Sequence, residues 1–291
     1  MSRLTAEQSF LLGLSRMVWA KRGAAKAAGL TFNEETITET ILLDLQTDYP
    51  GHVEVVAFNK RQEAKTGADW LWSFVSADGS RSLTMLVQAK RLEDVEQVYR
   101  GINRTIGKRL PPVRQIDQLL DTARQQGVPA FYAFYNHLSQ TSRVPKTCRS
   151  LDAGDVDHIC GFGVSLAEAQ SVKADLPDEM FDTHRGHSMP LHCLLCSWGS
   201  GTRPDGGTPE LAAAAIARLS GATAVDARGP EDLGLREGLH PLVEFALGIA
   251  ARRSDGVDNP EAENVPDIAG VVVLRDAKEM EKMRSWEHER R

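Results

Sequence analysis

The chain has 291 residues, enough for one large or two modest domains with a hydrophobic core. Hydrophobic residues make up 42% of the chain and charged residues 25%, which is ordinary for a globular protein and excludes wholesale disorder. Lysine and arginine total 34 against 40 aspartates and glutamates, so at a net charge of -6 any nucleic-acid contact requires a local basic face.

Cysteine usage and hydropathy indicate a cytoplasmic protein that makes no membrane contact. The chain has four cysteines, Cys148, Cys160, Cys193 and Cys196. They are too few for a disulfide framework and are typical of reduced thiols. The apolar run over residues 10–14 is too short for a signal-peptide core, and no run approaches the ~18 residues that span a bilayer.

Periodicity predicts helices and strands in the first half of the chain. Helical spacing of apolar residues predicts one helix over residues 5–21 and a second that starts at Asn33. Apolar runs predict strands over residues 52–59, 70–75, 83–89 and 128–136. The turn sequence of residues 76–79 joins two of these strands into a hairpin. A long helical region is expected from Val95 to Gln126, so the order is helix, three strands, helix, strand.

The second half is expected to continue this mixture of elements. Strands are predicted over residues 158–164, 190–198 and 268–274, and helices over 166–175, 209–220 and 240–251. The whole pattern predicts an α/β fold with a mixed central sheet flanked by helices. We expect a core over residues 1–145 and a C-terminal extension over residues 146–291 that completes the core or packs on it.

Cys193 and Cys196 have the C-x-x-C spacing of zinc ligands, and His184, His187 and His192 are near them in sequence. A zinc site needs four ligands, and here the second pair would have to come from scattered residues. The alternation of apolar residues over 191–198 fits a buried strand better. We therefore interpret these cysteines as core residues.

Polar residues gather at one end of the predicted hairpin. Asp69 opens the first strand, whereas Gln88 and Lys90 close the second, so antiparallel pairing brings the two ends together. Gln88 and Lys90 point to the same face because side chains alternate along a strand. Burying such groups is costly unless they pair, bind a metal ion or do chemistry.

This arrangement has the ligands that a phosphodiesterase needs for Mg²⁺. Asp69 and a carboxylate of the acidic helix start, which carries Glu35 and Glu39, supply hard oxygen ligands. The Gln88 side-chain oxygen and the Ala89 carbonyl can complete the coordination.

Lys90 would hold or polarise the attacking water and offset charge on the phosphorane. The alternative interpretation is a surface salt bridge between Asp69 and Lys90, which is common and contributes little to stability.

The segments TGADW (Thr66–Trp70) and QAKRL (Gln88–Leu92) carry a family resemblance. Asp69, Gln88 and Lys90 resemble the D…QxK variant of the PD-(D/E)xK nuclease signature, as seen in Mrr-like restriction endonucleases. The two segments are similar to a family of uncharacterised bacterial proteins built on that core, and the match covers roughly residues 30–136. The resemblance implies a restriction-endonuclease-like core, Mg²⁺ with Mn²⁺ as a substitute, and a role in prokaryotic restriction or anti-phage defence.

The resemblance also assigns the helix carboxylate to Glu35 or Glu39, one turn apart on the same face, with a slight preference for Glu35. Gln88 departs from the commonest family pattern because a second carboxylate usually stands there. The change removes one negative charge from the metal site and makes the helix glutamate more necessary.

A local excess of basic residues accompanies these motifs. Between Arg81 and Arg114 there are eight basic and three acidic residues, a balance of +5. Contacts with phosphate are expected from Arg91, Arg100, Arg104, Lys108 and Arg109, with Gln115 contacting substrate or water. For any single arginine, the alternative is a solvated helix face.

Together these patterns predict a Mg²⁺-dependent endodeoxyribonuclease. DNA is favoured over RNA as substrate, although nothing in the sequence reads a 2′-hydroxyl. Homo-oligomerisation and a partner protein of a defence system both stay open. The alternative function is a catalytically silent nucleic-acid-binding or assembly module on the same fold.

Overall fold

A computed structural model describes most of the chain. The described residues are 4–48, 52–58, 66–106, 112–145, 148, 151, 156–196, 207–220, 234–254, 268 and 270–276. Of the described helices, none is both long and apolar enough to cross a bilayer.

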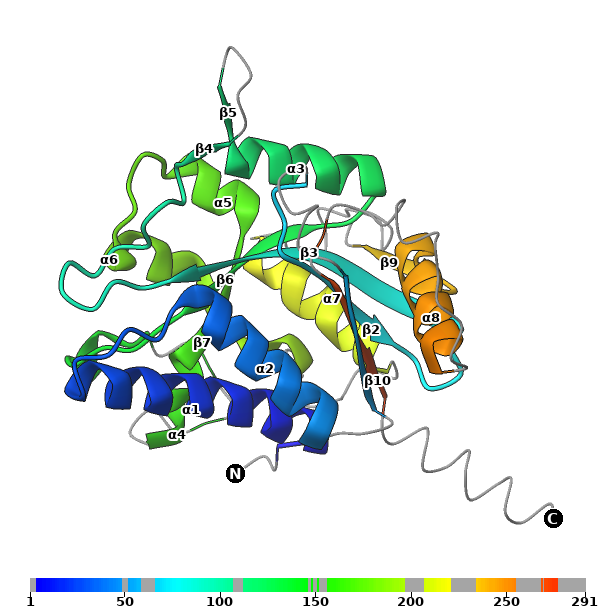
Figure 1. The fold of residues 1–291 in the computed structure, drawn as a ribbon, viewed down its shortest axis with the longest axis horizontal. Coiled ribbons are helices and arrows are strands. Elements are labelled where there is room, and N and C mark those ends of the chain that lie inside the picture. Colours follow the sequence, from blue (N-terminus) through cyan, green and yellow to red (C-terminus); the bar gives the residue numbers. More distant parts are fainter. Residues whose placement is uncertain are drawn as a thin grey trace.

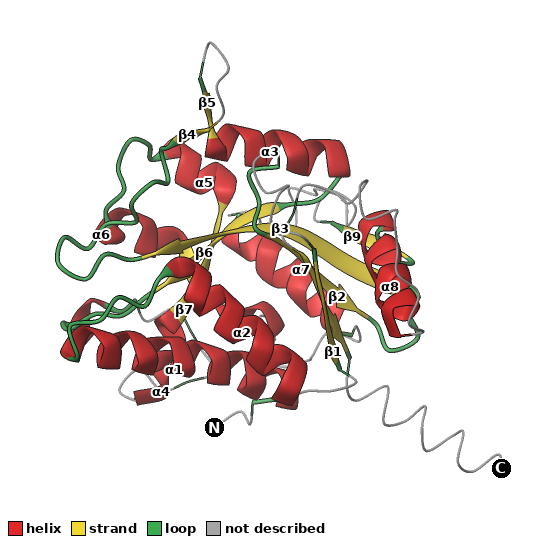
Figure 2. Ribbon diagram, viewed as in Figure 1, coloured by secondary structure: helices red, strands yellow, loops and turns green. Residues whose placement is uncertain are grey.

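A mixed eight-stranded sheet forms the centre of the molecule, with helices packed on its two faces (Figures 1 and 2). The strand order is β1-β10-β2-β3-β6-β7-β8, and β9 pairs with one end of β3. The strands are β1 (Val53–Ala57), β2 (Trp70–Val75), β3 (Arg81–Arg91), β6 (Ala130–Tyr135), β7 (Val164–Glu168), β8 (Ser188–Pro190), β9 (Leu235–Glu237) and β10 (Gly270–Arg275). Two short strands, β4 (Thr105–Ile106) and β5 (Val113–Arg114), pair separately. The predicted α/β class is confirmed.

The predicted hairpin is the β2–β3 pair at the centre of this sheet. The two strands are antiparallel, with Trp70 opposite Val87, and β6 lies parallel to β3 on its other side. Strand β10 lies between β1 and β2, although it comes from the C-terminal end of the chain. Residues on both sides of position 145 therefore build one sheet.

Eight helices are described: α1 (Ala6–Ala27), α2 (Glu34–Asp48), α3 (Gln115–Gln126), α4 (Val156–Cys160), α5 (Ala169–Ala174), α6 (Phe181–His184), α7 (Thr208–Leu219) and α8 (Pro241–Ser254). Apolar residues of α1, α2 and α7 pack on one face of the sheet. Residues of α3, α5 and α8 pack on the other face. Thr5 caps α1 in a capping box with Gln8.

Two predicted elements that precede β7 in the chain are wrong. The long helix over 95–126 is confined to α3, because Gln97 and Gly101 adopt positive φ angles of 55° and 79° that an α-helix does not accept. The strand over 158–164 is instead α4 followed by the 3₁₀ turn η3 (Gly161–Gly163), and β7 begins only at Val164. Gly163 packs so closely on α1 that a Cβ there would lie 1.9 Å from the Ser15 carbonyl oxygen.

Candidate functional site

Asp69 precedes β2 and is held there by β3. Its Oδ2 accepts hydrogen bonds from the Ala89 backbone N–H at 2.8 Å and from Gln88 Nε2 at 2.6 Å. The Asp69 backbone N–H donates to the Val87 carbonyl at 2.9 Å, which extends the hairpin pairing by one residue. The hairpin thus fixes the carboxylate beside the end of β3.

Gly67 determines how closely this turn approaches α3. Its φ is +72°, and a Cβ would lie 2.7 Å from both the Gln115 carbonyl oxygen and the Leu119 backbone nitrogen. Thr122 of α3 donates from Oγ1 to the Thr66 carbonyl at 3.0 Å. The TGADW segment therefore needs glycine here for two reasons, the backbone conformation and the contact with the helix.

Two glutamines link the Asp69 carboxylate to a basic side chain. Gln88 Oε1 accepts from Gln115 Nε2 at 2.6 Å, and Gln115 Oε1 accepts from Arg104 Nε at 2.8 Å. Gln88 and Gln115 are buried, whereas Arg104 is exposed. Because a carboxylate only accepts, the Gln88 amide nitrogen must face Asp69. The Gln88 oxygen then faces Gln115, so in this arrangement Gln88 acts as a bridge rather than in the metal-ligand role expected for its oxygen.

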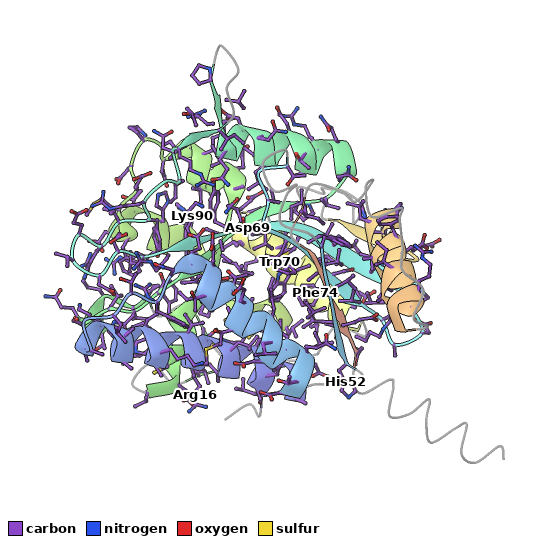
Figure 3. All side chains as sticks on the ribbon, in the orientation of Figure 1. Arg16, His52, Asp69, Trp70, Phe74 and Lys90 are labelled. Atoms are coloured by element: carbon purple, nitrogen blue, oxygen red, sulfur yellow. The ribbon has the colours of Figure 1, made fainter. Side chains whose placement is uncertain are left out.

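Lys90 is a buried ammonium group whose partner is Glu34. Its side chain is 4% exposed, and Nζ lies 3.6 Å from Glu34 Oε1. Glu34 Oε2 also accepts from the Arg91 backbone N–H at 3.2 Å. Glu34 occupies the first turn of α2, where the helix dipole favours negative charge. Figure 3 labels Asp69 and Lys90 near this end of α2.

Sequence reasoning missed Glu34 and chose its neighbours Glu35 and Glu39. The signal for Glu34 was its place directly after the helix-capping Asn33, whose carbonyl accepts from the Ile37 N–H at 2.9 Å. We call Glu34, Asp69, Gln88 and Lys90 the hairpin cluster.

A cavity of about 470 Å³ opens beside the hairpin cluster, a volume in the range of small-molecule sites. Both expected helix carboxylates, Glu35 and Glu39, are exposed and line this cavity. Its wall also includes Glu34, Asp69, Gln88, Arg104, Thr38 and the apolar side chains of Leu42, Val55, Phe58 and Trp70. The cavity therefore combines carboxylates, one guanidinium and an apolar wall.

Within the described part of the chain, groups of three potential metal ligands with atoms within 4.8 Å of one another occur at two places. They are Cys148, Cys193 and Cys196, and Asp175, His184 and His187. The cavity carboxylates do not form such a group. Mg²⁺ commonly binds through one or two carboxylates and keeps several waters. Asp69, one glutamate of α2 and the Ala89 carbonyl are donors of the kind it takes.

The chain matches, over residues 7–283, the model of a family described as a family of unknown function (DUF6615). It belongs to this family. No curated protein and no solved structure matches the chain. The match to DUF6615 spans the hairpin cluster and all four cysteines.

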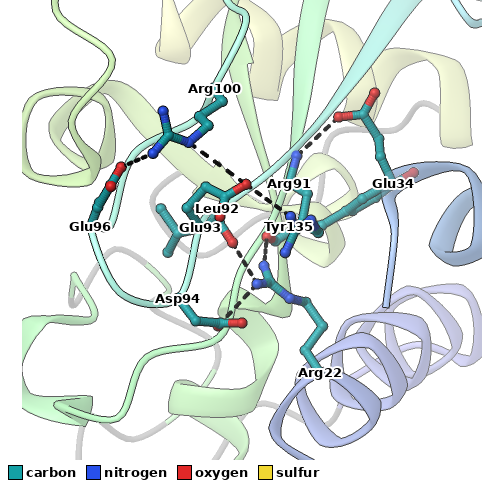
Figure 4. Close-up of polar contacts among 9 residues, drawn as sticks. All are labelled: Arg22, Glu34, Arg91, Leu92, Glu93, Asp94, Glu96, Arg100 and Tyr135. Carbon is teal, nitrogen blue, oxygen red and sulfur yellow. Dashed lines mark hydrogen bonds and ion pairs between the residues drawn. The ribbon is translucent and has the colours of Figure 1, made fainter. Parts of the chain in front are cut away.

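In this DUF6615 protein, a buried arginine fixes the strand ends next to Lys90 (Figure 4). Arg22 of α1 donates to the Tyr135 and Leu92 carbonyls, where β6 and β3 end, and pairs with Asp94 at 3.0 Å. Burial lowers the pKa of Arg22, and the Asp94 carboxylate opposes that shift. Three acceptors thus compensate the buried charge and hold two adjacent strands in register.

The basic residues predicted to bind nucleic acid are in different environments. Arg104 lines the cavity, whereas Arg91 pairs with Glu93 at 2.9 Å. Arg100 pairs with Glu96 and, at 3.9 Å, with Glu93 (Figure 4). Lys108 and Arg109 lie outside the described residues. Of the described residues in that prediction, Arg104 and Gln115 are the two whose side chains are hydrogen-bonded into the chain of contacts that reaches Gln88, whereas Arg91 contacts Glu34 through its backbone N–H.

Proposed function

We propose that this DUF6615 protein is a metal-dependent nuclease with its active site at the end of the β2–β3 hairpin. The observation that carries the proposal is the meeting of Asp69, Gln88 and Lys90 beside the acidic start of α2. Gln88 and Lys90 share one face of β3, and Asp69 contacts Gln88 directly. A charged cluster of this kind beside a cavity is a functional-site candidate.

The order of elements supports a restriction-endonuclease-like core and the PD-(D/E)xK assignment. Helix α2, strands β1 to β3, helix α3 and strand β6 occur in this order along the chain, with the short separate pair β4 and β5 between β3 and α3. This is the helix, three strands, helix, strand order that the sequence predicted. The motif positions Asp69, Gln88 and Lys90 lie at one end of the hairpin within that core.

The chain's own residues suit the task of phosphodiester hydrolysis. Asp69 and a glutamate of α2, Glu34 or Glu35, would hold Mg²⁺ or Mn²⁺, which supplies charge stabilisation to the scissile phosphate. Lys90 is preorganised by burial and by Glu34, so its ammonium orients water or a phosphate oxygen without a large rearrangement. Arg104 at the cavity wall contacts the phosphate backbone.

DNA is the proposed substrate, and the proposed setting is restriction or anti-phage defence in a prokaryotic cytoplasm. Both follow from the resemblance of Asp69, Gln88 and Lys90 to Mrr-like nucleases. The protein would act as a homo-oligomer or with a defence partner.

A second candidate function is a nucleic-acid-binding or assembly module without catalysis. The observation that favours it is the internal bonding of the cluster. Gln88 is hydrogen-bonded to Asp69 and Gln115, and Lys90 pairs with Glu34. Among the described residues, the cavity carboxylates form no group of three ligand atoms within 4.8 Å of one another. Such a module binds nucleic acid in the absence of metal, whereas a nuclease of this class needs metal to cleave.

Asp69→Asn separates the two functions. Asparagine keeps an oxygen that accepts from Ala89 and Gln88 but removes the charge that a metal ion requires. We expect single-turnover cleavage of supercoiled DNA in Mg²⁺ to fall by about 10²-fold or more. The melting temperature should stay within a few degrees of wild type. The matched control is Asp121→Asn on α3, where the exposed aspartate pairs with Arg124.

Replacing Mg²⁺ by Ca²⁺ should stop cleavage without stopping DNA binding. Parallel cleavage reactions with single-stranded RNA show whether DNA or RNA is the substrate. Wild-type protein that binds DNA equally with and without metal, and cleaves neither substrate in Mg²⁺ or Mn²⁺, would overturn the nuclease proposal and support the silent module.

A further inference from the structure

Three cysteines and one histidine from two distant segments meet in the core. Cys148 follows β6, whereas His192 and Cys193 lie in the 3₁₀ helix η5 (Leu191–Leu195) and Cys196 follows it directly. The three sulfur atoms lie within 4.8 Å of one another. His192 Nε2 is 3.1 Å from Cys148 Sγ and 3.7 Å from Cys193 Sγ. We call these four residues the cysteine cluster.

We propose that the cysteine cluster binds a structural zinc ion. In a tetrahedral zinc site, bonds of ~2.3 Å to sulfur and ~2.0 Å to nitrogen place the ligand atoms roughly 3.5 to 3.8 Å apart. His192 Nε2 lies 3.7 Å from Cys193 Sγ, inside that range, and 3.1 Å from Cys148 Sγ, below it. The group of ligand atoms within 4.8 Å of one another holds the three sulfurs without His192, so binding would bring Nε2 closer to Cys196 Sγ. Cys₃His is also an established ligand set for structural zinc.

The local conformation explains how Cys193 and Cys196 come to face one point. In a strand, side chains three positions apart point to opposite faces, so the strand predicted over 191–198 would separate the two sulfurs. A 3₁₀ helix has three residues per turn, so residues three apart lie on the same side. The structure has η5 over residues 191–195, and the predicted strand is wrong for these residues. Residues 197 and 198 lie outside the described part.

The burial of His192 is a second observation that points to a metal. Its side chain is fully buried, and Nδ1 has no hydrogen-bond partner within the described residues. Nε2 contacts thiol sulfurs, which are weak hydrogen-bonding groups. A bound cation at Nε2 would replace these weak contacts with a ligand bond, and Nδ1 would then carry the proton of the neutral imidazole. Gly161 makes room for the ring, because a Cβ there would lie 3.1 Å from His192 Cε1.

The ligand number and burial assign the ion a structural role. Cys193 and His192 are fully buried, and Cys148 and Cys196 are at most 7% exposed. Four protein ligands leave no open position for water or substrate, which distinguishes structural from catalytic zinc. On binding, the thiols release their protons to solvent, so that three thiolates and a neutral imidazole hold the ion.

The proposed ion would join parts of the chain that are far apart in sequence. Cys148 and His192 are 44 positions apart. Segment η5 packs against α1 and α7, and Gln8 of α1 donates to the Leu195 carbonyl at 2.9 Å. Zinc would therefore fix the chain that follows β6 to the helices on one face of the sheet.

Elemental analysis of the full-length protein, purified without chelator, tests the proposal. We expect about one zinc per wild-type chain. Cys193→Ser and Cys196→Ser should each lose most of the zinc. The matched control is Cys160→Ser in α4, because Cys160 is a free cysteine outside the cluster and should leave the zinc content unchanged. Chelation should lower the melting temperature, and Zn²⁺ rather than Mg²⁺ should restore it.

Cobalt substitution gives a readout that does not depend on whether the serine variants fold. The wild-type protein loaded with Co²⁺ should show the intense visible absorption of tetrahedral thiolate coordination. Wild-type protein that contains no zinc and binds neither Zn²⁺ nor Co²⁺ would overturn the proposal. Iron with sulfide in place of zinc, or full zinc content in both folded serine variants, would also overturn it. The proposal is independent of nuclease activity, since Asp69→Asn should retain its zinc.

Discussion

The hairpin cluster and the cysteine cluster each bring polar residues together from different segments of the chain, but their surroundings differ. The hairpin cluster borders a cavity of about 470 Å³, and its carboxylates are hard ligands of the kind that Mg²⁺ takes. The cysteine cluster is buried and offers soft sulfur ligands, with the Cys193 side chain fully enclosed. A cluster that borders a cavity can reach a substrate, whereas a fully enclosed cluster can hold a metal ion that cross-links the chain.

The two clusters also differ in how the backbone builds them. Asp69 and Lys90 come together because two antiparallel strands end at the same place beside the first turn of a helix. Cys193 and Cys196 come together through one turn of 3₁₀ helix, and Cys148 joins them from a different segment. A local pattern therefore defines most of the first cluster, whereas the second requires a long-range contact.

Lys90→Arg tests the comparison with the largest expected effect. Arginine keeps the charge, but its planar guanidinium cannot occupy the position of the compact ammonium between β3 and Glu34. We expect single-turnover cleavage to fall by on the order of 10²-fold, while DNA affinity in Ca²⁺ and zinc content stay near wild type. Lys173→Arg is the matched control, because Lys173 pairs with Asp117 at 2.9 Å on a part-exposed surface.

Near-normal cleavage by Lys90→Arg would mean that Lys90 has a structural role and no part in the chemical step. The hairpin cluster and the cysteine cluster would then no longer differ in function as proposed.

Gly67→Ala and Gly79→Ala test whether the hairpin cluster depends on the close approach of α3. Both glycines have a positive φ, +72° and +73°, but a Cβ at Gly79 would meet nothing within 4 Å. Alanine should cost about 1 kcal/mol at Gly79 from backbone strain, and about 1 to 3 kcal/mol more at Gly67 from the added overlap with α3. Urea unfolding measures both losses. Equal losses would show that the turn and the helix adjust freely.

Much of the fold could be predicted from the sequence, because the signals were local. Apolar runs and turn residues identified the β2–β3 hairpin. The alternation of side chains along a strand placed Gln88 and Lys90 on one face. Periodicity failed over residues 95–106 and 112–114, where the chain is not helical and where Gln97 and Gly101 have positive φ angles.

The rest depended on tertiary contacts that sequence patterns do not carry. Which of the closely spaced acidic residues of α2 reaches Lys90 is set by how the helix docks on the sheet, and the structure places Glu34 there. The cysteine cluster was missed because Cys148 is remote in sequence and because apolar alternation around Cys193 and Cys196 is typical of a strand. The C-x-x-C spacing was enough to mark Cys193 and Cys196 as possible metal ligands. The structure was needed to show that Cys148 and His192 lie beside them.

Arg104→Ala should have the smallest effect and separates binding from chemistry within the hairpin cluster. Arg104 is exposed at the cavity and donates to Gln115, which in turn donates to Gln88. As a phosphate contact, its loss should weaken DNA binding a few-fold and reduce the salt dependence of log affinity by about one. Cleavage by saturating enzyme should change little, because phosphate contacts position the substrate.

The matched control for this variant is Arg124→Ala, since Arg124 is an exposed arginine on α3 that pairs with Asp121 away from the cavity. Binding curves at several salt concentrations and single-turnover rates measure the two quantities separately. Unchanged affinity together with slower saturated cleavage would contradict the binding role. It would mean that Arg104 acts through Gln115 and Gln88 to position the Asp69 carboxylate, so that the reactive cluster extends through buried amides to the surface of the protein.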